Sequence, residues 1–208
     1  MLIFFGWRTR ASVVGNGVFH CPQCGADRSY ALKRMRRWFT LFFLPVIPLK
    51  TVGDFVQCET CNQSFNTTVL ETPTTATLQD ELMWAIREAT TVLLRAARSP
   101  ASESAAISVL SAFAGRPWSD AELAQDLSAL DTVHLQARLA HLAGTLNEQG
   151  KERFVAACAH VLATGGIINS DGRAAVEQMA VGLLMTPAHA RGIVDQTLED
   201  AEADRGSR

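Results

Sequence analysis

Cys21-Pro22-Gln23-Cys24 and Cys58-Glu59-Thr60-Cys61 are two Cys-x-x-Cys pairs in the first third of the chain. Two such knuckles supply four thiolates to one tetrahedral ion, and soft sulfur ligands select Zn²⁺. Four protein ligands leave no coordination position open for water, so hydrolytic zinc chemistry is not expected. The sequence therefore predicts one structural Zn²⁺ bound by Cys21, Cys24, Cys58 and Cys61.

Other interpretations of these cysteines are disulfide bonds, a redox-active pair and unrelated thiols. A redox motif needs only one pair, commonly at the start of a helix, whereas this chain has two pairs in strand-rich surroundings. Disulfides would suit a secreted protein, but Met1-Leu2-Ile3-Phe4-Phe5 lacks a leading positive charge and is too short for an export signal. His20, beside Cys21, is either a substitute ligand or a strand residue.

The segment between the knuckles has 33 residues, more than the roughly 15–20 of the commonest paired-knuckle spacing, so it should be structured. Residues 38–49 read Trp-Phe-Thr-Leu-Phe-Phe-Leu-Pro-Val-Ile-Pro-Leu. Trp and Phe favour strands, and the two prolines predict one extended piece up to Pro45 and another after Pro48. Gly25 and Asn62 follow the knuckles and tolerate positive φ, which predicts tight turns. This is the plan of a zinc ribbon.

Further strands are predicted at 2–7 and 64–70, with a hairpin turn at Gly15-Asn16-Gly17 between two apolar pieces. Residues 71–77 are polar and β-branched and contain a proline, which is typical of a linker. Beyond them the apolar period changes from two to 3.6. Seven helices are expected, at 78–97, 102–114, 119–130, 131–147, 151–164, 170–184 and 187–202.

Capping residues support these helix boundaries. Ser119 with Glu122 forms a capping box, Asp131 is expected to cap the fourth helix, and Thr186 with Pro187 starts the last one. Gly150 is expected to separate the fourth and fifth helices. The predicted fold is α+β in two domains: a small β zinc ribbon at 1–70, a linker at 71–77 and an all-α seven-helix bundle at 78–203.

Charge is distributed unevenly along the chain. Residues 1–72 contain eight Lys or Arg against four acids, and the remainder contains eleven against seventeen. No apolar run approaches the roughly 20 residues that span a bilayer, so no transmembrane segment is predicted. Thiolate zinc ligands and an odd fifth cysteine fit a reducing interior, so we expect a cytoplasmic protein.

One basic cluster, Lys33-Arg34-Met35-Arg36-Arg37-Trp38, has three interpretations. The cations and Trp38 could contact nucleic acid, they could lie at an anionic membrane surface, or they could balance the charge of the zinc tetrathiolate. An apolar patch as large as 38–49 would promote aggregation if exposed. We therefore expect it to dock on the helical domain or on a partner and not to span a membrane.

Two family resemblances follow from these motifs. Residues 78–200 resemble the TerB-like tellurite-resistance family through Leu162-Ala-Thr-Gly-Gly-Ile-Ile-Asn-Ser-Asp-Gly-Arg, followed by Leu183-Leu-Met-Thr-Pro-Ala-His. Residues 1–66 resemble bacterial zinc-ribbon proteins that carry a Phe-Phe-hydrophobic-Pro segment between knuckles. The first resemblance implies an all-helical fold whose hairpin turns carry an aspartate and a helix-opening glutamate, and it implies a role in stress response.

The chain departs from the TerB-like pattern at its turns. Gly115 and Gly165 stand where the family has its turn aspartate, and Gly172 stands in place of the second helix-opening glutamate, which Glu122 keeps in the first copy. A carboxylate metal site implied by those turns therefore lacks ligands at these positions. The nearby acids Asp171 and Glu177 are interpreted as a helix-start acid and a solvated side chain.

The remaining reactive side chains do not form a catalytic set. Cys158 lies in an Ala-rich face and is interpreted as a core residue. His134 and His141 are seven residues apart on one helix and would bind a metal only with a third ligand from elsewhere. We therefore expect a non-enzymatic adaptor with an unidentified protein partner, acting in a tellurite or envelope-stress response. The alternative is a nucleic-acid-binding ribbon regulated by the bundle.

Overall fold

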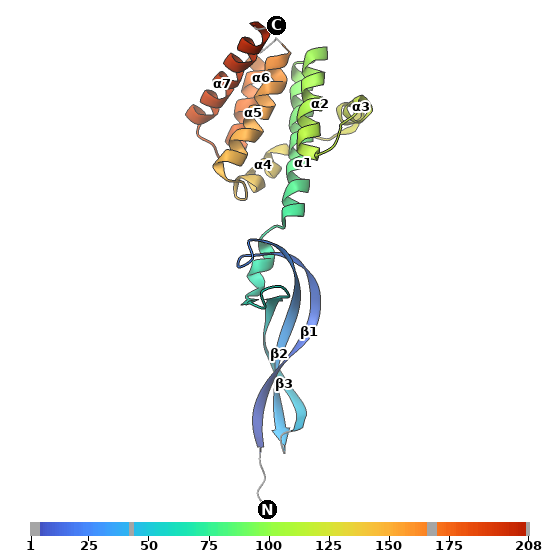
Figure 1. Cartoon of the computed structure of the whole chain (residues 1–208), viewed down its shortest axis with the longest axis vertical. Helices are drawn as coiled ribbons and strands as arrows, with labels where there is room; N and C mark the ends of the chain where they lie inside the picture. The colour runs from blue at the N-terminus through green and yellow to red at the C-terminus, as the bar shows by residue number, and fades with distance from the viewer. Residues whose placement is uncertain (1–4, 42–43, 166–169, 207–208) are drawn as a thin grey trace, which may run out of the picture. The chain divides into compact units, whose positions relative to one another are not determined.

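The computed structural model describes residues 5–41, 44–165 and 170–206 (Figure 1). The chain divides into two compact units, Met1–Thr77 and Leu78–Arg208. In the described residues the first unit contains a four-stranded antiparallel sheet, and helices make up the second. The predicted α+β arrangement in two parts is confirmed at this level.

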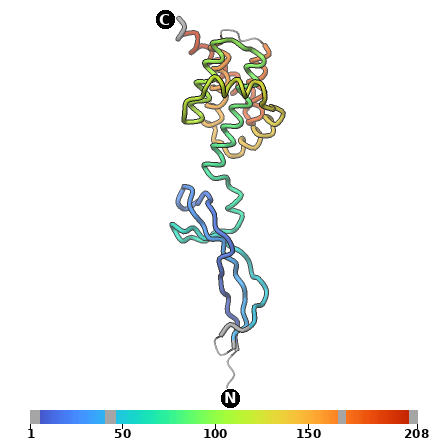
Figure 2. Tube along the Cα trace, turned by 90° about the vertical axis from the view of Figure 1, so that its right-hand side faces the viewer, coloured from blue at the N-terminus to red at the C-terminus, as the bar shows by residue number. Residues whose placement is uncertain are grey.

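The sheet consists of three long strands and one short strand. They are β1 (Phe5–Cys21), β2 (Ala26–Leu41), β3 (Leu44–Cys58) and β4 (Ser64–Phe65), in the order β1-β2-β3-β4. Figure 2 shows these strands running along one another, with part of β3 bowing away from β2 where the pairing is irregular. We call this sheet the ribbon.

The predicted hairpin turn at Gly15-Asn16-Gly17 is wrong, because β1 continues through these residues. The pairing with β2 shifts between Val13 and Gly15, so one extra residue forms a β-bulge there. The chain reverses at the first knuckle instead, where the Gly25 amide donates to the Cys21 carbonyl at 2.9 Å. Residues 2–4 of the predicted first strand lie outside the described residues.

The predicted interruption at Pro45 and Pro48 is also wrong, since both prolines lie within β3, opposite Thr40 and Trp38. β4 pairs with β3 only at Val56 and Gln57. At the prolines β3 is therefore an edge strand of the described sheet, where a missing amide donor is tolerated. Residues 42–43 of the predicted apolar run lie outside the described residues.

The predicted closing strand at 64–70 is mostly a different structure. β4 has two residues, and a 3₁₀ helix, η1 (Thr67–Glu71), follows it. Helix α1 (Thr75–Ala96) begins soon afterwards, so only 72–74 of the predicted linker are irregular. The Thr75 amide donates to the Asp27 carboxylate at 2.8 Å, which ties the start of α1 to β2.

The buried core of the ribbon lies at one end of the sheet. Phe19, Cys21, Val56 and Cys58 are fully buried there. The Phe19 ring lies 5.5 Å from the Tyr30 ring, edge to face, and 5.9 Å from the Phe65 ring, measured between centroids. We call this the zinc end of the ribbon, because it carries the four cysteines.

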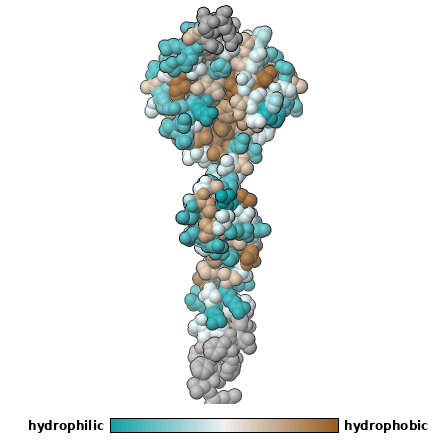
Figure 3. Space-filling model, viewed as in Figure 1, coloured by the Kyte–Doolittle hydropathy of each residue, from teal (hydrophilic) through white to brown (hydrophobic). Residues whose placement is uncertain are grey.

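Seven helices are found in the described residues from Thr75 onward, as predicted. They are α1, α2 (Pro100–Ala114), α3 (Asp120–Ala129), α4 (Leu135–Ala143), α5 (Glu148–Thr164), α6 (Ser170–Gly182) and α7 (Pro187–Gly206). Their apolar faces share one core. On the face shown in Figure 3, hydrophobic residues gather in the middle of the helical unit, with hydrophilic residues around them.

Helix caps account for most of these boundaries. The Ser119–Glu122 capping box is present, and the Thr186 hydroxyl accepts a bond from the His189 amide at the start of α7. Two predicted boundaries are wrong. Asp131 accepts from the Val133 amide and so stabilises a turn before α4, while Asn147, not Gly150, marks the start of α5.

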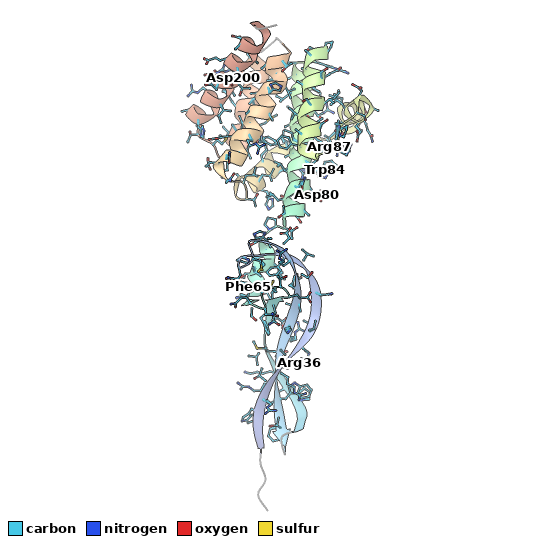
Figure 4. All side chains as sticks on the ribbon, viewed as in Figure 1. Arg36, Phe65, Asp80, Trp84, Arg87 and Asp200 are labelled. Atoms are coloured by element: carbon cyan, nitrogen blue, oxygen red, sulfur yellow. The ribbon has the colours of Figure 1, made fainter. Side chains whose placement is uncertain are left out.

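Two buried acids fix neighbouring helices to α1. The Arg87 guanidinium on α1 forms a bidentate ion pair with Asp126 on α3, and Arg138 on α4 pairs with Glu88 on α1. The Arg87 guanidinium also lies 4.5 Å from the centroid of the Trp84 ring (Figure 4). Each buried carboxylate thus has the cationic partner that its burial requires.

Candidate metal centre

Each knuckle is a tight turn at the end of a long strand. Cys21 ends β1 and Cys58 ends β3, so the sheet brings the two pairs together. Gly25 has φ 61° and Asn62 has φ 59°, which confirms the left-handed positions predicted after each knuckle. The Asn62 amide donates to the Cys58 carbonyl at 3.0 Å, matching the bond at the first knuckle.

The four cysteine sulfurs form one compact cluster. All four ligand atoms lie within 4.8 Å of one another, and the Sγ atoms of Cys21 and Cys61 are 3.8 Å apart. Zn–S bonds of about 2.3 Å in a tetrahedron place neighbouring sulfurs about 3.8 Å apart. All four thiols are free, so the disulfide interpretation is wrong, and the cluster has the size and the donors that a tetrathiolate zinc site needs.

The second knuckle is built to hold a thiolate. Burial by itself raises the pKa of the Cys58 thiol, but the backbone amides of Cys61 and Thr60 donate to its sulfur, and its pKa falls to about 6. At the first knuckle, burial and the neighbouring thiols raise the pKa of Cys24 to about 12. A bound dication would hold both in the thiolate form, as a metal does to a coordinating thiol.

His20 has another partner. Its Nδ1 lies 3.1 Å from Oδ1 of Asp27, whose second oxygen accepts the Thr75 amide. Burial raises the pKa of Asp27, but the bonds from His20 and Thr75 outweigh burial and lower it below its ordinary value. His20 therefore helps to orient Asp27 beside the knuckle and lies outside the sulfur cluster.

The five residues of the predicted basic contact have different surroundings. The Lys33 ammonium donates to the Gln57 side chain at 2.5 Å, and Arg34 forms a bidentate pair with Asp54 at 2.8 and 2.9 Å. Arg34 lowers the pKa of the Asp54 carboxyl through these bonds. Arg36 and Arg37 are exposed and have no ion pair with a described residue, and Trp38 is half-buried.

The register adds cations that the linear cluster did not reveal. Arg10 pairs with Arg36 and Arg8 pairs with Trp38 across β1 and β2, so these four residues share one sheet face. Lys50 on β3 is exposed in the same half of the ribbon. Arg36 lies well away from Phe65 at the zinc end (Figure 4). The alternation of residue types in 5–12, with Arg8 and Arg10 at every second position, was the sequence signal that could have predicted this basic sheet face.

The helical unit contains no second metal cluster in the residues that the structure describes. His141 pairs with Glu81 at 2.8 Å, and His134 does not join it in a ligand set. Asp171 lies in the first turn of α6, and Glu177 pairs with Arg173. Gly115 has φ 65° and forms the C-cap of α2.

The comparison with protein families bears on the ribbon. Residues 19–87 match the model of a zinc-ribbon family. The match includes both knuckles and extends into α1, so a zinc-ribbon segment with one structural Zn²⁺ at Cys21, Cys24, Cys58 and Cys61 is supported by sequence and geometry together. No curated protein and no solved structure matched the chain.

A zinc ion at this site would join strand ends that are distant in sequence. It would connect the turn between β1 and β2 with the turn after β3, where the small core of Phe19 and Val56 lies. None of the described helices has the length and apolar character of a membrane-spanning segment.

Proposed function

We propose that this protein is a non-enzymatic adaptor in which the zinc ribbon and the helical unit each bind a partner. This proposal rests on the surface of the ribbon in the half that lies away from the zinc end. There, Arg8, Arg10, Arg36 and Arg37 are exposed without ion pairs to described residues, next to exposed apolar side chains such as Trp7. Unpaired cations and exposed aromatic surface together are typical of a binding surface.

The zinc site supports binding rather than catalysis. Four thiolates complete a tetrahedral shell, so a metal held there would have no position for a water nucleophile. Its contribution is to fix the strand ends, because metal binding of this type is coupled to folding. The ribbon is then a rigid platform for the residues that β1, β2 and β3 carry.

The role of the helical unit rests on its resemblance to the TerB-like family. That resemblance supports a cytoplasmic protein in a tellurite or envelope-stress response, with a protein partner held by the helices. The turn positions at Gly115, Gly165 and Gly172 supply no carboxylate, so we propose binding through the helix surfaces and not through a metal in this unit.

Affinity capture from cell extract, with and without nuclease, tests the adaptor proposal. The bait is the full zinc-loaded chain, compared with a Trp7→Ser/Ile47→Ser variant and with a Val133→Ser control, since Val133 is an exposed apolar residue of the helical unit. We expect a protein that survives nuclease treatment and is lost with the ribbon variant. Recovery of nucleic acid alone would refute the adaptor.

A nucleic-acid-binding ribbon is the second candidate, and the shared face of Arg8, Arg10, Arg36 and Trp38 favours it. Binding of a single-stranded oligonucleotide should then fall steeply with salt and weaken in Arg10→Ala and Arg36→Ala variants. Arg34→Ala is a poor probe, because it would also leave Asp54 without its ion pair. Salt-independent binding would argue against this candidate.

A further inference from the structure

The strand register arranges the ribbon in rows that cross all three long strands. The outermost described row contains Phe5, Leu41 and Leu44. Two rows further in come Trp7, Phe39 and Ile47, and the next row contains Arg8, Trp38 and Pro48. We call the rows from Phe5 to Trp7 the apolar end, which lies opposite the zinc end.

Two large apolar side chains of the Trp7 row are exposed. Trp7 is 65% exposed and Ile47 is 52% exposed, although the Trp7 ring contacts the Phe39 ring edge to face at 5.6 Å between centroids. The buried apolar cluster of the ribbon lies at the zinc end instead. Exposed aromatic and aliphatic side chains in one row, Trp7 with Ile47, are typical of a surface that binds something apolar.

A group of cations follows the apolar end directly. Arg8, Arg10, Arg36, Arg37 and Lys50 are exposed, and none forms an ion pair with a described residue. Asp54 is the one acid in 5–13 and 34–54, and Arg34 already neutralises it. We call these five residues the cation belt. It leaves a net positive charge just behind the apolar rows.

We propose that the apolar end docks end-on on the surface of an anionic lipid bilayer, with the cation belt at the level of the lipid phosphates. This inference rests on the proposed binding function of the ribbon and names the partner of that surface. Apolar side chains that enter the headgroup–acyl boundary and cations that meet anionic lipid are the two contributions that hold peripheral proteins on membranes.

The dimensions of the ribbon fit this depth. A strand rises about 3.4 Å per residue, so the step from the Phe5 row to the Arg8 row spans about 10 Å. Interfacial segments are buried by about 5–10 Å, whereas the hydrocarbon core is about 30 Å thick. The described rows of the apolar end are therefore long enough to enter the interface, and they cover only a fraction of the thickness of the bilayer.

The prolines of β3 suit the same environment. β1 and β3 are the edges of the sheet at this end, and edge amides that leave water without a partner are destabilising. Pro45 and Pro48 remove two amide donors from the β3 edge. They also block the pairing of this edge with another sheet, which favours lipid over a second strand as the partner.

The order of the rows argues against nucleic acid at this end. A groove for a phosphate backbone would place cations along the contact surface, with aromatic rings between them. Here, rows of apolar residues lie beyond the belt at Trp7 and Ile47, where phosphate gains nothing. Sequence alone favoured docking of 38–49 on protein, because the register that places the belt behind the apolar end was not visible.

Vesicle flotation of the full-length, zinc-loaded protein tests the proposal. The vesicles are phosphatidylcholine alone and phosphatidylcholine with about one third phosphatidylserine. We expect binding to the anionic vesicles only. Arg36→Gln/Arg37→Gln should lower the partition coefficient about 30-fold. Trp7→Ser/Ile47→Ser should lower it by at least about 10-fold.

Matched controls carry the same changes elsewhere. Arg28→Gln/Arg153→Gln removes two exposed cations outside the belt, and Val133→Ser removes an exposed apolar side chain of the helical unit. Both controls should bind as the wild type does. Zinc content and far-UV circular dichroism of each variant show that it is folded.

Three results would overturn the proposal. They are no binding to anionic vesicles, binding that the Trp7→Ser/Ile47→Ser change leaves intact, and equal losses in the controls. If the wild type shows no binding to anionic vesicles while the Trp7→Ser/Ile47→Ser variant no longer captures the protein partner that the wild type captures, membrane docking is wrong and the adaptor function stands. Vesicle binding without any protein partner supports membrane docking and removes the adaptor function.

Discussion

Cys58 is the residue on which the zinc centre depends most directly. It ends β3, it is fully buried, and two backbone amides stabilise its thiolate. We expect about one zinc per chain in protein purified without added metal, and loss of that zinc in Cys58→Ser, measured by elemental analysis. Cys158→Ala is the control, because Cys158 is buried among the helices and should leave zinc content unchanged. Iron, or no metal in the reduced wild type, would contradict the assignment.

Glu122 makes the stability of the helical unit dependent on pH. The side chain of Arg116 and then the amide and hydroxyl of Ser119 lower the pKa of this carboxyl from 4.5 to about 2. Because the folded pKa lies below the ordinary value, its stabilisation is complete above about pH 4.5 and is lost as pH falls toward 2.

The charge of Glu122 can be tested with Glu122→Gln, since glutamine still completes a capping box. The melting temperature of the wild type should exceed that of the variant at neutral pH, and the difference should disappear between about pH 4.5 and 2. Glu199→Gln serves as the control, because Glu199 is exposed and has no ion pair with a described residue. A difference that stays constant with pH would show that charge is not its cause.

Single residues differed in how far the sequence could predict them. The four cysteines and the positive φ of Gly25 and Asn62 follow from local spacing, which fixes knuckle geometry. The partner of Arg34 could not be predicted, because Asp54 lies 20 residues away and reaches it only through the register of β2 and β3. His20 was ambiguous for the same reason, since Asp27 is its neighbour across the sheet.

Among the helices and strands, the seven helices were predictable and the ribbon strands were not. Helices such as α3 carry local caps and a 3.6-residue period. The strands have 15 to 17 residues and are exposed over much of their length, so no single buried face imposes a clean alternation. Pro45 and Pro48 were predicted to interrupt the strand, because a proline is tolerated there only at a sheet edge. That edge exists because β4 pairs with β3 only at Val56 and Gln57, which the sequence does not reveal.

The contact between α1 and α3 contains the ion pair of Arg87 with Asp126, and removal of one partner alone leaves the other without its counter-charge. Asp126 is 3% exposed, and both oxygens of its carboxylate accept hydrogen bonds from the Arg87 guanidinium. Arg87→Met should lower the free energy of unfolding by about 3–5 kcal/mol, because a buried carboxylate is left unpaired. Urea unfolding of the variant measures this change.

The double variant Arg87→Met/Asp126→Leu separates the ion pair from the packing around it. An apolar pair of similar volume should recover most of the lost stability, since replacing both partners removes the unpaired charge. Arg98→Gln is the control, because its pair with Glu103 lies at the surface and should contribute about 1 kcal/mol or less. Additive losses in the double variant would mean that Arg87 acts through the Trp84 and Trp118 rings instead.

For the whole molecule, two units with separate cores should respond separately to removal of the metal. The ribbon core surrounds the cysteines, whereas the core of the helical unit contains none of the four ligands. A chelator should abolish the near-ultraviolet circular dichroism of the Phe19 and Tyr30 pair and leave most of the helical signal. A fragment from Thr75 to the end should be helical without zinc. Parallel loss of both signals would show that the helices need the ribbon.

The division into a ribbon and a helical unit was visible in the change of period and in the charge difference between the two parts. The function of the helices could not be predicted from the sequence. Their turns carry glycines such as Gly115 at positions where a reactive side chain would have identified a site. The binding surface of the ribbon depends on which residues the strand pairing places in one row, such as Arg10 with Arg36. The spacing of residues in the sequence does not determine that pairing.

Because Cys158 lies in the core of the helical unit, the number of cysteines that react with a thiol-reactive dye depends on the state of the protein. Its side chain has no exposed surface, and burial raises its pKa to about 12, so a thiol-reactive dye should not modify it while the helices are folded. The other four of the five cysteines are the proposed zinc ligands. Dye uptake should therefore be none with zinc bound, four per chain after gentle chelation, and five only in denaturant. One labelling reaction followed by intact-mass measurement would then report the metal state and the folding of the helices in the same sample.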